Sequence, residues 1–132
     1  MTSHVTTHVL DAAQGRPASG VSVRLEAAED SLAGSSIGTE DSLAGSSIGT
    51  TEWTSLAEAV TDADGRVKEL GPEQLEAGDY RLTFGTGDYF DRLGIESFYP
   101  QVQITFRITD PAQHYHVPVL LSPFAYSTYR GS

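Results

Sequence analysis

The strongest constraint on the fold is an alternation of apolar and polar residues with a period of two. Residues 102–109 read Val-Gln-Ile-Thr-Phe-Arg-Ile-Thr, and shorter alternating runs cover residues 21–26 and 80–84. A period of two places every second side chain on the same face of a β-strand. Two more short strands are predicted at residues 115–121 and 126–130. The chain is therefore predicted to be built mainly of half-buried strands.

Turn-forming residues separate these runs at short intervals. They occur as Asp64-Gly65, Gly71-Pro72, Gly85-Thr86-Gly87 and Asp110-Pro111. Only residues 88–93, closed by Gly94, predict a short helix, and residues 73–77 predict at most one helical turn. Many short strands with one small helix favour an antiparallel β-sandwich. The 132 residues are the length of one domain with one core, so residues 1–132 are assigned to a single domain.

One segment of the chain is a perfect tandem repeat. Residues 29–39 read EDSLAGSSIGT, and residues 40–50 repeat the same eleven letters. Two copies rich in Gly, Ser and Thr are too few for a solenoid, and long surface insertions cost little free energy. We interpret residues 29–50 as a duplicated loop insertion outside the chemistry of the protein.

Composition excludes several classes of function. The 18 acidic and 8 basic residues give a formal net charge of -10, which repels the phosphates of nucleic acids. The chain has no Cys, so disulfides, thiol catalysis and Cys-based zinc sites are excluded. Its longest apolar stretch, residues 117–121, is too short to cross a bilayer. With no secretory signal at the N-terminus, we expect a cytoplasmic protein without membrane or nucleic-acid partners.

The histidines are the candidate proton carriers, because imidazole titrates near neutral pH. His4 and His8 share one face of an N-terminal strand, and His114 and His116 share one face of a later strand. Each can also be an ordinary solvated strand residue. A third interpretation is a metal-binding β-sandwich that uses all four, although no third ligand stands at a recognisable spacing. Arg66 follows the Asp64-Gly65 turn and is expected to begin a strand at the end of a sheet.

Three segments together resemble the transthyretin-related 5-hydroxyisourate hydrolase family. They are Thr7-His8-Val9-Leu10-Asp11 with Gly15-Arg16-Pro17-Ala18, then Thr61-Asp62-Ala63-Asp64-Gly65-Arg66, and finally His114-Tyr115-His116-Val117-Pro118 with Tyr126-Ser127-Thr128-Tyr129-Arg130-Gly131-Ser132. The ending Tyr-Arg-Gly-Ser is the specific signature. The resemblance covers nearly the whole chain except the repeat.

The resemblance implies a transthyretin-like sandwich of two four-stranded sheets with one short helix. It further implies a homotetramer, a dimer of dimers, with active sites in a channel between dimers and no cofactor or metal. Carried over by motif, the catalytic residues are His8, Arg66, His116 and Ser132, and His116 is favoured over His114. His8, Arg66 and Tyr129 are expected to bind the substrate.

The implied reaction is the hydrolysis of 5-hydroxyisourate to 2-oxo-4-hydroxy-4-carboxy-5-ureidoimidazoline in urate degradation. One imidazole, of His8 or His116, is expected to take a proton from the attacking water, and Arg66 is expected to stabilise developing negative charge. Which histidine is the base stays open, and the two can act as a coupled pair. The alternative is a non-catalytic transthyretin-like carrier. Hormone-carrying transthyretins lack these histidines and the Tyr-Arg-Gly-Ser end, so this chain favours the enzyme.

Overall fold

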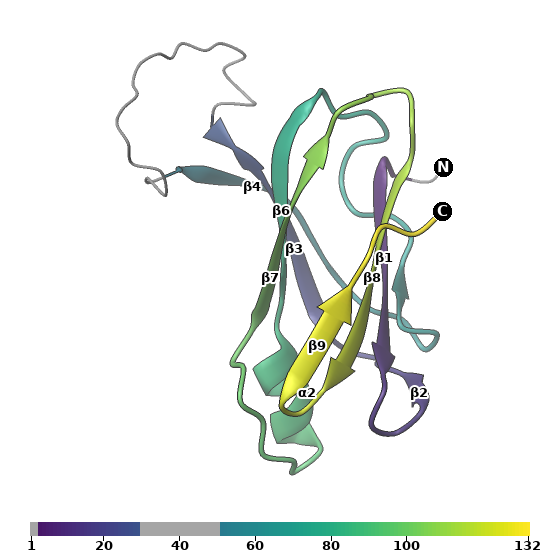
Figure 1. Cartoon of the computed structure of the whole chain (residues 1–132), viewed down its shortest axis with the longest axis vertical. Coiled ribbons are helices and arrows are strands. Elements are labelled where there is room, and N and C mark those ends of the chain that lie inside the picture. Colours follow the sequence, from purple (N-terminus) through teal and green to yellow (C-terminus); the bar gives the residue numbers. More distant parts are fainter. Residues whose placement is uncertain (1–2, 30–50) are drawn as a thin grey trace.

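The computed structural model describes residues 3–29 and 51–132. In these residues nine strands form two facing sheets, and one short helix lies at one end of them (Figure 1). In chain order the elements are β1 (Val5–Asp11), β2 (Arg16–Pro17), β3 (Ser22–Ala28), β4 (Trp53–Val60), β5 (Arg66–Val67), β6 (Gly78–Phe84), α2 (Thr86–Arg92), β7 (Val102–Ile108), β8 (Tyr115–Ser122) and β9 (Ala125–Thr128). The predicted β-sandwich with one short helix is confirmed.

The first sheet has the order β2-β1-β8-β9, and β5 also pairs with β1. Strand β5 pairs with Thr7 and His8, whereas β2 pairs with Leu10 and Asp11. The two short strands therefore share one edge of β1, and this five-stranded sheet is at most four strands wide. Strands β1 and β8 run parallel, from the pair Val5 and Tyr115 onward. The sandwich is therefore not antiparallel throughout, unlike the antiparallel sandwich that the sequence predicted. Strands β1 and β8 can pair in parallel because they lie near opposite ends of the chain and no hairpin joins them.

The second sheet has the order β4-β3-β6-β7, and all its pairings are antiparallel. The apolar halves of the alternating patterns point between the sheets. The largest fully buried side chains come from both sheets, helix α2 and the connections, and are Phe84, Phe90, Leu25, Leu70, Leu82, Ile108, Leu121, Val5, Val9, Val21, Val23 and Val102. Burying such side chains is the dominant stabilising contribution to the fold.

Helix α2 closes one end of the core. Its Tyr89 and Phe90 are buried, and the Tyr89 hydroxyl donates to Oδ2 of Asp11 at 2.8 Å. Burial and, secondarily, the Asp11 carboxylate raise the pKa of Tyr89 to about 12. Asp11 is only 1% exposed and also accepts from the backbone N–H of Gln14. Asp11 therefore ties the end of β1 to the helix and serves the fold.

The helical turn predicted at residues 73–77 does not form, and that prediction is wrong. The segment is irregular because tertiary hydrogen bonds hold it instead. The Leu75 N–H donates to Nδ1 of His4 at 2.7 Å, and the Gln74 side chain donates to the Pro111 carbonyl at 2.7 Å. A tertiary contact thus overrides a weak local preference.

The tandem repeat at residues 29–50 lies outside the described residues, apart from Glu29 at the end of its preceding strand. Our interpretation of it as a loop insertion stays a prediction. The Glu29 N–H donates to the Glu52 carbonyl at 2.9 Å, so the two sides of the repeat meet at the edge of the β4-β3 pair.

Candidate active site

Four of the five predicted site residues, namely His8, Arg66, His116 and Ser132, lie at the outer face of the five-stranded sheet. In β1 the odd-numbered side chains point into the core, so Thr6 and His8 point outward. In β8 the same alternation turns His116 outward, between the buried Tyr115 and Val117. The parallel register pairs Thr6 with His116, and the antiparallel register with β5 pairs His8 with Arg66. Four chemically active side chains from three strands therefore share one surface.

A tight turn at residues 62–66 places both Arg66 and His8. The Asp62 carboxylate accepts from the backbone N–H groups of Asp64 at 2.9 Å and Arg66 at 3.0 Å. These bonds, that of Arg66 first, lower the pKa of Asp62. The Asp64 carbonyl, 3.0 Å from Nε2 of His8, can only accept, so His8 carries a proton on Nε2. The unprotonated atom of neutral His8 is then Nδ1.

Gly65 is required by this turn for two reasons. Its φ is +76°, a backbone conformation that residues with a Cβ rarely adopt. A Cβ at position 65 would also lie 2.3 Å from the Val9 carbonyl oxygen. The Gly65 carbonyl also accepts from the Val9 N–H at 2.7 Å, which fixes the turn against β1. The turn therefore needs glycine at this position to approach β1 closely.

We expect Gly65→Ala to destabilise the protein by about 1–3 kcal/mol through backbone strain, to add the cost of moving the Val9 carbonyl away from the new Cβ, and to lower kcat/KM by moving Arg66. Gly15→Ala is the matched control, because Gly15 has a similar φ of +70° but open space around its Cβ position. Thermal unfolding and turnover of both variants test this. Equal losses in the two variants would mean that the approach to Val9 is unimportant.

His116 is held on two sides. Its Nδ1 lies 2.9 Å from the Thr6 hydroxyl, and that hydroxyl also lies 2.8 Å from Nε2 of His114. On the other edge of the ring, a Cβ on Gly131 would lie 2.7 Å from Cδ2 of His116. Any larger residue at position 131 would push the tail and the His116 ring apart. The orientation of the imidazole is therefore fixed by its neighbours.

The Tyr-Arg-Gly-Ser segment returns across β8 toward the start of β1 (Figure 1). The Gly131 N–H donates to the His116 carbonyl at 2.8 Å. The Arg130 guanidinium lies 4.2 Å from the centre of the Tyr115 ring and donates to the His114 carbonyl at 3.2 Å. These contacts bring Ser132 to the site, so the motif has a clear structural role.

A cavity of about 240 Å³ lies among these residues. It is lined by residues of β1, β5 and β8, by the residues next to β5 and β8, and by the returning tail, namely Thr6, Thr7, Arg66, Val67, Lys68, His114, His116 and Ser132. Sequence reasoning missed Thr6 and Lys68 here. Lys68 could have been predicted from the sequence. It stands two residues after Arg66, and side chains two residues apart in an extended segment point to the same side. Two cations in one cavity favour an anionic ligand on a protein that is otherwise strongly acidic.

The environment of the cavity keeps His116 neutral. Burial is the largest cause that lowers the pKa of His116, followed by the charges of Arg66, His114 and His8. Burial and then His4 also lower the pKa of His114. A neutral imidazole at pH 7 can accept a proton, whereas an imidazolium cannot. His116 is therefore suited to act as a base.

His4, in contrast, is part of the fold. It is 5% exposed, its Nε2 donates to the Gln113 carbonyl at 2.7 Å, and its Nδ1 accepts from the Leu75 N–H. Both ring nitrogens are thus occupied by backbone groups. Although His4 follows the alternation of His8, the structure does not bring it into the cavity with His116.

The chain is similar to proteins of known family. Residues 5–131 match the model of the HIUase/Transthyretin family. The chain belongs to this family. A relative from Salmonella dublin, named 5-hydroxyisourate hydrolase, is 41% identical over 129 residues, which are 97% of this chain and 80% of the relative.

Similar solved structures include both a hydrolase and a transthyretin bound to thyroxine. The 5-hydroxyisourate hydrolase of Klebsiella pneumoniae has 38% identity and a TM-score of 0.71, covering 97% of this chain and 98% of that chain. Sea bream transthyretin, solved in complex with thyroxine, has 30% identity and a TM-score of 0.75, covering 96% and 93%. Because the fold matches both, the side chains of the site decide between the two functions.

Within this family fold, Tyr129 lines a neighbouring cavity of about 260 Å³. That cavity is bounded by β7, β8 and the returning tail, and Phe106, Tyr115 and His116 also line it. His116 therefore borders both cavities, whereas Arg66 and Ser132 border only the first. The substrate-binding role of Tyr129 stays a prediction.

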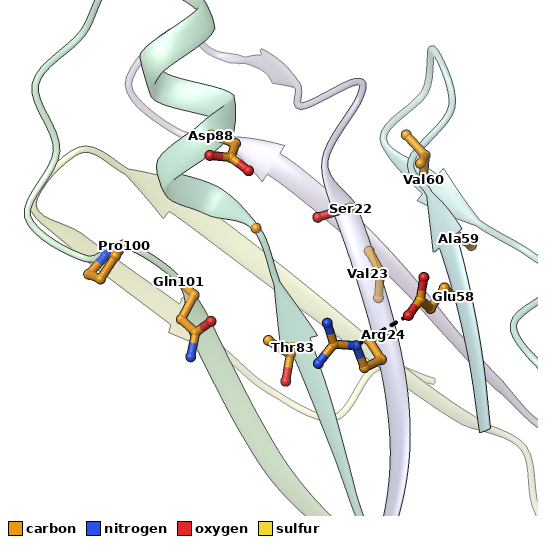
Figure 2. A pocket seen from close by; sticks show the side chains of 11 residues that line it. Ser22, Val23, Arg24, Glu58, Ala59, Val60, Thr83, Asp88, Pro100 and Gln101 are labelled. Atoms are coloured by element: carbon orange, nitrogen blue, oxygen red, sulfur yellow. Dashed lines mark ion pairs between the residues drawn. The ribbon is translucent and has the colours of Figure 1, made fainter. Parts of the chain in front are cut away.

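A third cavity, of about 500 Å³, lies on the outer side of the other sheet (Figure 2). Strands β3, β4 and β6 and helix α2 supply its charged and polar residues, among them Arg24, Glu58 and Asp88. Figure 2 shows Arg24 directed at Glu58, and their ion pair measures 3.5 Å. This cavity contains none of the predicted site residues.

Among residues 3–29 and 51–132, no group of three or more His, Cys, Asp or Glu side chains is placed to hold a metal ion. The four histidines of the metal-binding alternative fall into two settings, since His4 bonds to backbone while the others face the outer surface. In the described segments no helix is both long and apolar enough to cross a bilayer.

Proposed function

We propose that this chain hydrolyses 5-hydroxyisourate to 2-oxo-4-hydroxy-4-carboxy-5-ureidoimidazoline at the outer face of the five-stranded sheet. The observation that carries the proposal is that His8, Arg66 and His116, from three strands, share one face of the sheet, where Arg66 and His116 line a cationic cavity and His8 pairs with Arg66 beside it. The name of the similar relatives supplies the substrate. A thyroxine-type carrier has no need of two oriented imidazoles beside an arginine.

Neutral His116 takes a proton from a water molecule as that water attacks a carbonyl carbon of the six-membered ring. His8, whose Nε2 is held by the Asp64 carbonyl, orients the same water through Nδ1. The carbon–nitrogen bond then breaks, and the proton held by a histidine goes to the leaving nitrogen. General acid–base assistance of this type contributes about 10²–10⁴-fold.

Arg66 stabilises the negative charge that develops on the attacked carbonyl oxygen, and Lys68 helps to admit the substrate. The guanidinium has several N–H donors in one plane, which suits the oxygen-rich edge of a purine-like ring. The Ser132 hydroxyl supplies a further donor at the edge of the cavity. Every step uses side chains of the chain and water, with no cofactor or metal.

The active protein is a cytoplasmic homotetramer, a dimer of dimers. Two observations support assembly. Strands β7 and β9 lie at the edges of their sheets, and an exposed aromatic cluster lies near β9. Phe98 and Phe124 in this cluster are 65% and 60% exposed and stack on each other. Exposed apolar clusters of this kind mark interaction surfaces.

Light scattering of the purified protein should give a mass equal to four chains. A monomer with full activity would contradict the proposed active-site channel between dimers.

The pH dependence of turnover follows from the state of His116. Its pKa lies below the ordinary value of about 6.5, because burial and Arg66 disfavour the imidazolium. The neutral form is the base, so kcat/KM should rise with pH, and the midpoint of that rise should lie below pH 6.5. An acid limb centred above pH 7 would contradict this assignment.

The proposed function is tested by generating 5-hydroxyisourate in situ from urate with uricase and following the decay of its absorbance. We expect the protein to accelerate the decay well above the spontaneous rate and a chelator to leave the acceleration unchanged. A decay equal to that of buffer, from a folded protein, would leave the carrier as the function. Deleting residues 40–50 separates an intrinsic lack of activity from an effect of the repeat.

A further inference from the structure

The Thr6 hydroxyl joins two imidazoles behind the proposed base. Its Oγ1 lies 2.8 Å from Nε2 of His114 and 2.9 Å from Nδ1 of His116. Thr6 is 7% exposed, and the β1–β8 register pairs it directly with His116. The hydroxyl is therefore held in place by the sheet, and both contacts have the length of good hydrogen bonds.

Proton counting limits what this arrangement can do. A hydroxyl has one proton, so it can donate to only one of the two ring nitrogens, and it must accept from the other if both hydrogen bonds are made. When Thr6 donates to His114, it accepts from Nδ1–H of His116, and Nε2 of neutral His116 is then the free base. When Thr6 donates to His116, the proton of neutral His116 lies on Nε2 instead. The position of the Thr6 proton thus selects which nitrogen of His116 is free.

We propose that Thr6 and His114 form a proton relay behind His116. This inference rests on the proposed hydrolysis, since it concerns how His116 changes from base to acid within one turnover. Thr6 and His114 act through His116 and are positioning residues.

The relay balances as follows. His116 takes the water proton on Nε2 and becomes an imidazolium. Its Nδ1 proton moves to the Thr6 oxygen, while the Thr6 proton moves to Nε2 of His114. His116 is then neutral with its proton on Nε2, and His114 carries the positive charge. When the Nε2 proton passes to the leaving nitrogen, the reverse shift through Thr6 returns a proton to Nδ1, and His114 becomes neutral again.

The surroundings support this exchange. Arg66, Lys68 and Ser132 line the cavity beside the two rings, and His8 lies on the same face. Burial and then the charge of Arg66 disfavour a lasting positive charge on His116, so passing the charge on relieves it. His114 is the more exposed of the two rings, so a charge on it is better solvated.

Thr6→Val, Thr6→Ser and His114→Gln test the relay, alone and in the double variant Thr6→Val with His114→Gln. Valine keeps the shape of threonine without the hydroxyl, and serine restores the hydroxyl. We expect Thr6→Val and His114→Gln each to lower kcat about 10–100-fold at nearly unchanged KM, and Thr6→Ser to stay within about threefold of the wild type. The double variant should be no slower than the slower single one, because both break the same relay.

Three outcomes would overturn the proposal: wild-type kcat in Thr6→Val, equal losses in Thr6→Ser and Thr6→Val, or multiplicative losses in the double variant.

A second readout does not depend on turnover. Nitrogen NMR of the imidazoles over pH 4–8 should show coupled titration of His114 and His116 in the wild type and uncoupled titration in Thr6→Val. If the wild type shows no hydrolysis but coupled titration, the proposed function fails while the hydrogen-bonded relay stands. Independent titration in the wild type would remove the relay itself.

Discussion

Replacing His116 with glutamine should lower kcat about 10²–10⁴-fold while the protein keeps its fold. Glutamine can still form a hydrogen bond with the Thr6 hydroxyl, but it cannot take a proton from water at neutral pH. The loss expected is therefore the contribution of a general base. Steady-state decay of 5-hydroxyisourate, with circular dichroism of the same sample, measures both properties.

His4→Gln is the matched control, because it removes a histidine next to the start of β1 whose two ring nitrogens both bond to backbone groups. It should leave the Leu75 N–H without its acceptor and cost about 1–3 kcal/mol of stability, with near-normal kcat in the folded protein. The two variants thus lose different properties. If His116→Gln lost stability and kept kcat, His116 would be a structural residue and the site would need another base.

Replacing Arg66 with glutamine should lower kcat/KM about 10²–10³-fold, the usual effect of removing one donor that stabilises a developing oxyanion. Arg66 begins β5 opposite His8 and lines the same cavity as His116. Glutamine keeps a polar group there but removes the charge and the planar fork. Initial rates at several substrate concentrations separate a loss of binding from a loss of turnover.

Arg24→Gln removes a charge of the same kind from the cavity on the opposite sheet. Its ion pair with Glu58 is exposed, and its 4.0 Å contact with the buried Glu26 is backed by the closer Arg81 at 2.8 Å, so little stability is lost. We expect wild-type rates from this variant. Equal losses from Arg24→Gln and Arg66→Gln would show that net charge, and not the position of Arg66, controls the reaction.

Most strands could be predicted because their alternation is local. Strand β7 reads as apolar and polar residues in turn, and β3, β6 and β8 follow the same rule in shorter form. Strand β4 escaped prediction since it lies at a sheet edge, where most of its residues are only partly buried. Its register against β3 also shifts between Leu25 and Glu26, which breaks the period of two.

The site could be predicted only in part, for a related reason. Alternation within one strand places Thr6 on the face of His8, and the spacing places Lys68 on the face of Arg66. No local pattern tells that β1 runs parallel to β8, and this pairing alone sets Thr6 against His116. The contacts of Arg130 and Gly131 likewise join residues that are distant in the sequence, and no local pattern predicts them. The resemblance of the Tyr-Arg-Gly-Ser ending singled out Tyr129 and Ser132, but it gave no physical reason for the motif.

Backbone NMR of the labelled protein during addition of urate tests the location of the site most directly. Urate is a stable purine-like anion with the ring system from which the substrate is made. We predict that the resonances that shift cluster at Thr6, Arg66, Lys68 and His116, around the cavity on the outer face of the five-stranded sheet. Shifts confined to Ser22, Thr83 and Gln101, around the cavity of the other sheet, would contradict the proposed active site.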